Sequence, residues 1–114
     1  MVSAVYAEYQ VKKDIKSIIP TEYHLSQNYP NPFNPITKIS FDLPNDAKVK
    51  LTVYDLLGRE IKSIVNNVLT TGRYTFEFDG SNFASGVYFY RIAVHSDKLS
   101  TGDFTGVKRM VLVK

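Results

Sequence analysis

Alternating apolar and polar positions divide most of the chain into short segments that are typical of β-strands. In Lys38–Leu43, the residues Ile39, Phe41 and Leu43 fall on one face, and Lys48–Tyr54 repeats the pattern. Successive side chains of a strand point to opposite faces, so strict alternation predicts strands with one buried face. Two neighbouring strands are therefore expected here.

The same reasoning predicts four more strands, at Glu60–Val65, Arg73–Asp79, Val87–Val94 and Val107–Val113. Ile64 interrupts the alternation of the first, which predicts a bulge or an edge position. The second alternates most regularly, with its aromatic residues inward: Tyr74, Phe76 and Phe78. Val87–Val94 is apolar on both faces except at one arginine, which predicts a strand in mid-sheet with both faces largely covered.

Residues that favour turns separate these strands. Asp55-Leu-Leu-Gly58 predicts a short hairpin turn in which the aspartate accepts backbone donors and the glycine takes the left-handed conformation. Asn66–Gly72 and Gly80–Gly86 are predicted as loops, and His95–Gly106 as a polar hairpin loop. The three prolines of Asn28–Pro35 predict an extended, polyproline-like segment.

Strands at this spacing, without an amphipathic helix, are typical of an all-β fold. We expect an immunoglobulin-like antiparallel β-sandwich of about seven strands, the seventh lying around Leu25. A small barrel is less favoured because it needs a ring of evenly long strands. Residues 1–22 are expected to be a linker or the remnant of an upstream cargo domain, and residues 23–114 the sandwich.

Composition narrows the function classes. The 14 basic and 11 acidic residues are scattered rather than gathered in a stripe, which disfavours nucleic acid as a partner. The longest apolar runs, Val87–Tyr90 and Met110–Val113, are four residues long. That is far below the roughly 20 needed to span a bilayer, so no membrane insertion is expected. Residues 1–22 also lack the pattern of a secretory signal, so the chain either stays inside the cell or has its export signal upstream.

The sequence contains no set of residues that is typical of a catalytic or metal-binding site. The chain has no cysteine, which removes thiolate metal sites and cysteine nucleophiles. His24 and His95 lack a carboxylate or a second histidine at ligand spacing, and no histidine adjoins Ser81 or Ser85. Aspartates near the strand ends are explained by turns better than by calcium binding. We therefore expect a non-catalytic module, not an enzyme, with no cofactor and no metal.

Six blocks of the sequence, in order, resemble the type A C-terminal sorting domain of the type IX (Por) secretion system of Bacteroidetes and relatives. The blocks are Leu25–Pro35 (LSQNYPNPFNP), Thr37–Pro44 (TKISFDLP), Val49–Arg59 (VKLTVYDLLGR), Gly72–Asp79 (GRYTFEFD), Ala84–Ile92 (ASGVYFYRI) and Lys108–Lys114 (KRMVLVK). An immunoglobulin-like domain of the flagellar hook-capping protein is similar over part of the pattern. The resemblance covers about residues 20 to 114.

The resemblance implies a signal module that directs an exported cargo through the type IX system to the cell surface or exterior, by way of the periplasm. Its implied partners are an outer-membrane translocon, a cell-surface sortase and an upstream cargo domain in the same chain. The residues implied in recognition are Gly72, Tyr74, Gly86, Val87, Tyr88, Lys108, Arg109, Met110, Val111, Leu112, Val113 and Lys114.

Two hypotheses concern how such a signal is read and what else the domain could be. The terminal strand, with Lys108, Arg109 and Lys114 around an apolar centre, is expected to dock by strand addition or by a charged grip. The first alternative is a carbohydrate-binding or adhesive accessory module with an aromatic platform made by Phe83, Tyr88 and Tyr90. The second is a structural spacer, which predicts a chain that continues past Lys114, whereas sorting requires Lys114 to be the natural end.

Overall fold

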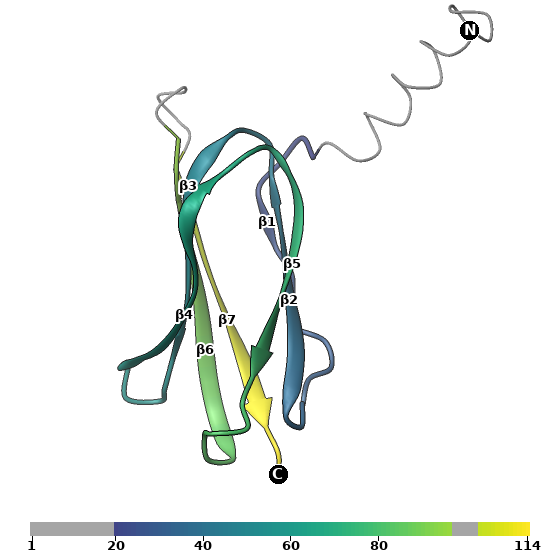
Figure 1. The fold of residues 1–114 in the computed structure, drawn as a ribbon, viewed down its shortest axis with the longest axis vertical. Coiled ribbons are helices and arrows are strands. Elements are labelled where there is room, and N and C mark those ends of the chain that lie inside the picture. The colour runs from purple at the N-terminus through teal and green to yellow at the C-terminus, as the bar shows by residue number, and fades with distance from the viewer. Residues whose placement is uncertain (1–19, 97–102) are drawn as a thin grey trace, which may run out of the picture.

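The computed structural model describes residues 20–96 and 103–114, which form two antiparallel sheets packed face to face (Figure 1). The strands are β1 (His24–Leu25), β2 (Ile36–Leu43), β3 (Ala47–Tyr54), β4 (Glu60–Leu69), β5 (Gly72–Asp79), β6 (Gly86–His95) and β7 (Phe104–Leu112). One sheet has the order β1-β2-β5 and the other β4-β3-β6-β7. The predicted all-β sandwich of about seven strands is confirmed.

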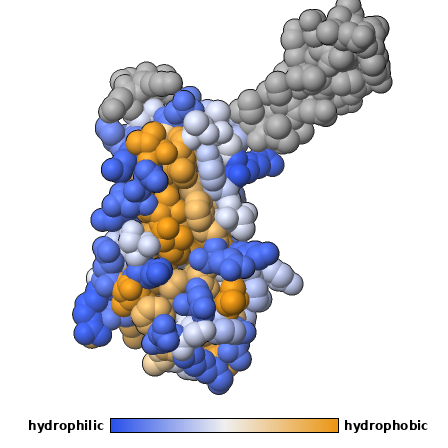
Figure 2. Space-filling model, viewed as in Figure 1, coloured by the Kyte–Doolittle hydropathy of each residue, from blue (hydrophilic) through white to orange (hydrophobic). Residues whose placement is uncertain are grey.

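The alternation seen in the sequence places the core between the two sheets. The fully buried aliphatic and aromatic side chains come from both layers: Ile39, Phe41 and Leu43 from β2, Val49, Leu51 and Val53 from β3, and Tyr90, Ile92, Met110 and Leu112 from β6 and β7. Burial of such side chains is the main favourable contribution to folding. Seen from the side, the sheets flank a stripe of apolar residues that reaches the surface (Figure 2).

β4 differs from its prediction in length. Asn66–Leu69 continues the strand instead of forming a loop, and Asn66 and Asn67 lie opposite Lys50 and Val49 of β3. The pairing shifts between Leu51 and Thr52, where Val65 and then Ser63 are the partners and one residue is skipped. The skipped residue is Ile64, so the predicted bulge is confirmed.

The prediction for Val87–Val94 is confirmed in position and wrong in burial. β6 lies in mid-sheet between β3 and β7. Its even-numbered residues face the core, whereas Phe89 and Ala93 on the outer face are half-buried and Arg91 is exposed. The outer face is not covered because the domain has only two layers.

The proline-rich segment is held by side-chain hydrogen bonds and is not a regular polyproline-like run. Its Tyr29–Pro30, Asn31–Pro32 and Asn34–Pro35 peptide bonds are cis. Asn28 is 2% exposed, and its amide donates to the Thr37 hydroxyl at 2.9 Å and to the Pro30 carbonyl at 3.1 Å. These bonds hold the segment along the edge of β2 that lies opposite β5, where Tyr29 also pairs with Lys38.

Two predictions fall wholly or partly outside the described residues. The expectation that residues 1–22 are a linker or remnant concerns residues 1–19 for the most part, and it stays a prediction. The predicted hairpin loop His95–Gly106 includes residues 97–102, while its last three residues belong to β7. Within residues 20–96 and 103–114, no helix is long and apolar enough to cross a membrane.

Candidate functional site

The residues predicted to take part in recognition lie at both ends of the sandwich. Gly86 lies opposite Leu112, and Tyr88 opposite Met110, so the start of β6 and the end of β7 form one group. We call this end, where β7 finishes, the C-terminal end. Gly72 and Tyr74 begin β5 at the other end, opposite Leu43 and Phe41, so the structure does not bring them to the same place.

Two of the predicted elements share the pattern Gly-x-Tyr: Gly72-Arg-Tyr74 and Gly86-Val-Tyr88. Both glycines are the first residue of a strand, with φ of +154° and +156°, values that L-residues rarely adopt. The Tyr74 hydroxyl donates to the Thr70 carbonyl at 2.6 Å, and the Tyr88 hydroxyl to the Ala84 carbonyl at 2.5 Å. Each tyrosine thus fastens a connection between the two sheets, as the tyrosine corner of other sandwiches does.

The outer edge of β7 is occupied along its last residues. The Phe33 amide donates to the Val111 carbonyl, and the Val113 amide to the Phe33 carbonyl, both at 2.9 Å. The Val111 amide donates to the Asn31 side chain at 3.0 Å, and the Gln27 side chain donates to the Arg109 carbonyl at 2.7 Å. Strand addition at this stretch would have to displace these bonds, which argues against that form of the docking hypothesis.

Phe33 anchors this contact in the core. Its side chain is 1% exposed and meets the Phe78 ring edge-on, with the centroids 5.9 Å apart. A Cβ added at Gly80 would lie 3.2 Å from the Phe33 ring and 3.0 Å from the Leu112 side chain. The fit of Phe33 therefore depends on a glycine at position 80.

The cations of the charged-grip hypothesis do not form a single patch on β7. Met110 and Leu112 are core residues, so Lys108 is on the inward side and Arg109 on the outward side. Arg109 instead shares the outer face of its sheet with three exposed cations of β3 and β6: Lys48, Lys50 and Arg91. The outer-face positions of β3, β6 and β7 carry no acidic side chain. We call this surface the basic face.

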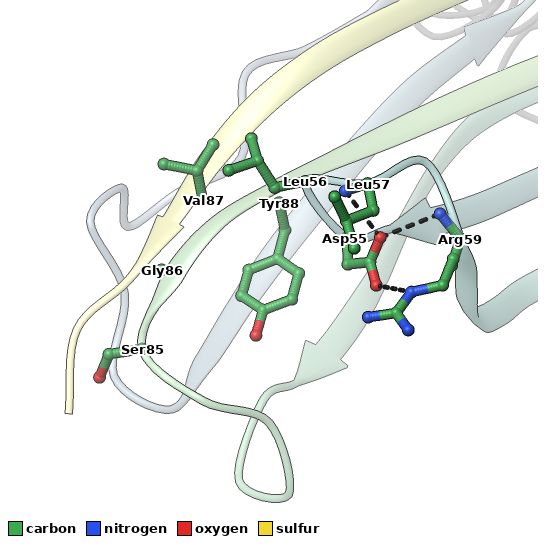
Figure 3. A pocket seen from close by; sticks show the side chains of 8 residues that line it. All are labelled: Asp55, Leu56, Leu57, Arg59, Ser85, Gly86, Val87 and Tyr88. Carbon is green, nitrogen blue, oxygen red and sulfur yellow. Dashed lines mark hydrogen bonds and ion pairs between the residues drawn. The ribbon is translucent and has the colours of Figure 1, made fainter.

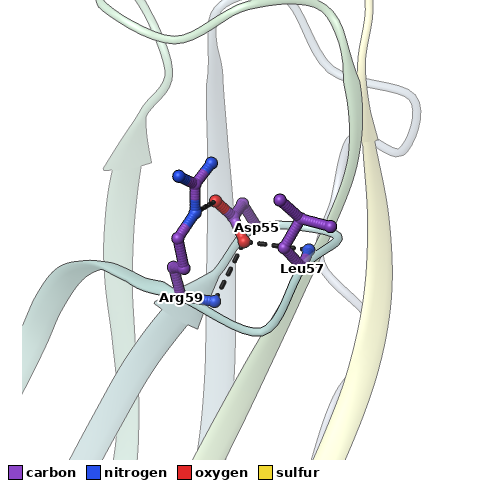
Figure 4. A network of polar contacts seen from close by, with 3 residues as sticks. All are labelled: Asp55, Leu57 and Arg59. Atoms are coloured by element: carbon purple, nitrogen blue, oxygen red, sulfur yellow. Dashed lines mark hydrogen bonds and ion pairs between the residues drawn. The ribbon is translucent and has the colours of Figure 1, made fainter.

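A rigid turn joins β3 to β4 at the C-terminal end. The Asp55 carboxylate accepts hydrogen bonds from the amides of Leu57 and Arg59, both at 2.9 Å, and from Arg59 Nε at 2.7 Å (Figure 4). These bonds, the backbone bond from Arg59 foremost, hold the pKa of Asp55 below its ordinary value. Gly58 has φ of +83°, so the predicted turn is confirmed.

The same turn borders a shallow pocket with the start of β6 (Figure 3). The turn contributes Asp55, Leu56, Leu57 and Arg59, and the other wall is Ser85–Tyr88. The Leu56 and Leu57 side chains are 67% and 78% exposed, although they are held on a well-bonded turn. Sequence reasoning found this turn but did not assign it to the site.

Lys114 is bonded to the loop before β6. Its amide donates to the Ser85 hydroxyl at 2.9 Å, and its Nζ to the Ser81 carbonyl at 2.6 Å. Asp79 accepts hydrogen bonds from the Ser81 hydroxyl and amide, and these bonds, with the charge of Lys114 as a smaller cause, lower the pKa of Asp79. The end of β7 and the start of β6 are thus joined by polar contacts as well as by pairing.

The titratable side chains of the described residues offer no metal-binding group. No group of three or more His, Asp or Glu side chains in that part of the chain could hold a metal ion. His95 Nδ1 lies 2.7 Å from Asp103 Oδ1, a pair that the sequence reasoning missed, but both side chains are well exposed. Burial raises the pKa of Tyr90 to about 12, and its hydroxyl donates to the Ser26 carbonyl at 2.6 Å, so it serves as a structural bond.

The alternative of an aromatic platform is not supported by the burial of its rings. Tyr88 is 8% exposed and Tyr90 is 0% exposed. Phe83 is half-buried and stacks on Phe78 at 5.8 Å, and it is tilted by 58° from Tyr88. A sugar platform needs exposed rings in one plane, and these three residues do not provide it.

Over residues 27–102 the sequence matches the family described as the secretion system C-terminal sorting domain. The chain belongs to this family. The matched range contains both Gly-x-Tyr elements and the Asp55–Arg59 turn of the sorting domain but ends before β7. The role of Lys108–Lys114 therefore remains a prediction from the sequence resemblance.

The comparisons with other proteins add no functional argument. No curated relative matches the sequence. Among solved structures, a β-glucuronidase from Parabacteroides merdae is similar at 14% identity and a TM-score of 0.44, over 83% of this chain. The sorting domain spans 13% of that enzyme's length. A likeness at this level carries no conclusion about this chain.

Several residues of the C-terminal end were missed at the sequence level. Gln27, Asn31 and Phe33 occupy the edge of β7, and Ser81 and Ser85 bind Lys114. The available signal was the Leu25–Pro35 block of the resemblance, which does not indicate what this segment contacts. A contact between residues 80 positions apart leaves no trace in local periodicity.

Proposed function

We propose that this domain is the signal that directs an attached cargo protein through the type IX secretion system to the cell surface or exterior. The cargo reaches the periplasm first, and an outer-membrane translocon then reads the folded domain before a surface sortase acts on the cargo. The family match over residues 27–102 carries the proposal. The family's members are sorting signals, and no catalytic role is proposed for the domain itself.

We also propose that the basic face is the surface that the translocon contacts. A signal that serves many cargos must be read on surface features that do not depend on the cargo. Arg91 of β6 and Arg109 of the edge strand β7 project from the outer face of the four-stranded sheet, near the apolar Phe89 and Val111. Cations around an apolar centre favour a partner with an acidic, partly apolar surface. This arrangement keeps the charged grip of the sequence hypothesis but moves it from the β7 edge to the sheet face.

The test attaches the full chain of 114 residues to the C-terminus of a reporter that carries its own periplasmic export signal, in a bacterium with a working type IX system. Surface delivery is measured as reporter accessible to protease on whole cells plus reporter in the medium. Arg109→Glu is expected to reduce delivery by about tenfold, since reversing a rim charge changes both attraction and repulsion. The variant protein should retain its thermal unfolding midpoint because the Arg109 side chain is exposed.

The matched control is Lys38→Glu, the same charge reversal at an exposed position on the outer face of the other sheet. It should be delivered like the wild type. Equal delivery of both variants would overturn the basic face as the contact surface but leave the sorting role intact. Failure of the wild-type fusion to reach the surface, with the reporter folded in the periplasm, would overturn the sorting role itself.

A further inference from the structure

Among the described residues, none pairs with the backbone groups along the outer edge of β5. Lys38 of β2 exchanges both backbone hydrogen bonds with Tyr29, and the Ser40 carbonyl accepts from the Ser26 amide. Even-numbered residues of β2 thus direct their backbone groups away from β5. The odd-numbered residues bond to β5, since the direction alternates along an antiparallel ladder.

This alternation decides which residues of β5 face outward. The odd-numbered residues Ile39 and Phe41 lie opposite Phe76 and Tyr74, so even-numbered positions of β5 take the bonds to β2. The backbone groups of its odd-numbered positions then point to the free edge: Arg73, Thr75 and Glu77. In the part of the chain that the structure describes, β5 has no other strand partner.

The edge is also regular in its pairing and apolar on its inner side. All eight residues of β5 pair with β2 without a register shift, whereas β4 is bulged. Tyr74 and Phe76 are only half-buried, although they stack on Phe41 at 5.4 and 5.8 Å. A long, regular, unprotected edge beside apolar side chains is a template for pairing with another strand.

We propose that a second copy of this chain occupies the β5 edge, pairing β5 with β5 in antiparallel orientation about a two-fold axis through Thr75. A two-fold interface requires a surface that is complementary to itself. With Thr75 opposite its own copy, Arg73 lies opposite the other copy's Glu77, and this ion pair occurs twice. On the inner side, Tyr74 lies opposite the other copy's Phe76, also twice. The three-stranded sheet becomes one sheet of six strands.

The register follows from backbone direction as well as from charge. Thr75 and its copy both direct their amide and carbonyl groups outward, so they can exchange two hydrogen bonds. Directly opposed unlike charges and aromatic pairs each stabilise a strand pair, and like charges opposed destabilise it. Pairing would also shield the half-buried Tyr74 and Phe76 from water. This proposal is independent of the sorting role.

Charge reversal and its rescue test the proposal on the full chain. The wild type is expected to dimerise at protein concentrations on the order of 100 μM, as measured by analytical ultracentrifugation. Arg73→Glu and Glu77→Arg should each weaken the dimer by about tenfold, because two opposed like-charge pairs replace two unlike pairs. The double variant R73E/E77R should restore wild-type affinity to within about threefold, since the pairs are again unlike.

The absence of cysteine supplies a second, geometric test. Thr75→Cys should form a disulfide-linked dimer under mild oxidation, because opposed residues of this kind lie about 5.5 Å apart at their Cα atoms. Asn67→Cys, exposed on β4, is the control and should stay monomeric. A monomeric wild type, a double variant that remains weak, or equal cross-linking of both cysteines would overturn the proposal. A monomeric chain whose export is lost in Arg73→Glu would show that the export machinery uses the edge instead.

Discussion

The two ends of the sandwich use the same Gly-x-Tyr corner but complete it with different partners. At the end that holds Tyr74, the crossover from β4 to β5 is closed by nearby loops: the Thr71 amide donates to Asp46 at 2.8 Å and its hydroxyl to the Leu43 carbonyl at 2.7 Å. At the C-terminal end, the corner with Tyr88 adjoins Phe33 and Lys114, which come from the beginning and the end of the domain.

This difference affects which surfaces of the domain an export machinery can bind. At the end with Tyr74, the hydrogen bonds that close the crossover come from residues between β2 and β5, and β7 contributes only its start, where Phe104 stacks on Tyr23 at 5.2 Å. The C-terminal end is complete only when β7 has paired with β6 and the Phe33 segment has closed over it. A surface that includes β7 therefore exists only in the fully folded domain, and recognition of that surface would select folded cargo signals.

The largest effect is expected from removing the anchor of the C-terminal end. Phe33→Ala should lower the free energy of unfolding by about 3–5 kcal/mol, since it deletes a buried ring and leaves a cavity. It should also speed hydrogen exchange at the Val113 amide, whose bond to the Phe33 carbonyl closes the edge of β7. Urea denaturation and amide exchange measure the two effects.

Leu25→Ala is the matched control. Leu25 is 4% exposed, and it packs against Gly106 near the start of β7. It should cost about 2–5 kcal/mol without selective exchange at Val113. The two variants are compared by hydrogen exchange at the Val113 amide after correction for their loss of global stability. If exchange there is then equally fast in both, the Phe33 segment does not specifically protect the C-terminal end.

The next effect concerns the two corner glycines. Gly72→Ala and Gly86→Ala should each destabilise the domain by about 1–3 kcal/mol, because a side chain is disfavoured at these φ values. A Cβ at Gly86 would meet no atom within 4 Å, whereas at Gly72 it would lie 3.7 Å from the Tyr74 ring. The cost at Gly86 is thus purely one of backbone conformation.

A semisynthetic protein with D-alanine at position 86 isolates that cost. A D-residue favours the mirror-image region of backbone space, so this variant should recover most of the stability that L-alanine loses. Thermal unfolding of the three proteins provides the measurement. Equal destabilisation by both forms of alanine would mean that space, and not φ, restricts the position.

A smaller difference is expected between the two tyrosine hydroxyls. Tyr88→Phe should cost about 1–2 kcal/mol and Tyr74→Phe less, although both delete a bond to a backbone carbonyl of similar length and Tyr74 also loses a contact with the Thr70 hydroxyl. Tyr88 is 8% exposed, so the Ala84 carbonyl loses its partner where water has little access. Tyr74 is half-buried, and water can replace its hydroxyl. Equal losses in urea denaturation would contradict this argument.

The strands of this fold could be predicted because each buries one face in a two-layer domain. Arg73–Asp79 is an example: its alternation alone placed the strand to within one residue of β5. The pair Asn66-Asn67 was misassigned to a loop, since asparagine favours turns. Opposite β3, those residues complete a ladder, and their position in the sheet outweighs their local preference.

The candidate site was less predictable than the fold. Resemblance marked Gly86–Tyr88 and the end of β7, but it did not indicate that the tyrosine fastens a corner or that Met110 and Leu112 belong to the core. It also missed the basic face, because the register of β6 and β7 is needed to place Arg91 and Arg109 on the same face of the sheet. Such contacts are set by strand pairing, which a single sequence does not specify.

The smallest effect should be a pH dependence of the stability at the C-terminal end. Asp55 and Asp79 both have a clearly lowered pKa, and both lie at that end. A lowered pKa in the folded state means that the ionised form adds stability above the unfolded pKa, near 3.8. This contribution disappears as the pH falls through the folded pKa.

Asp79→Asn should therefore unfold at a slightly lower temperature than the wild type near neutral pH. The difference between the two should shrink as the pH falls below 3.8 and then through the lowered pKa of folded Asp79, because the aspartate side chain becomes neutral like that of asparagine. A difference that stays constant with pH would show that the bonds from Ser81 to Asp79 do not depend on its charge.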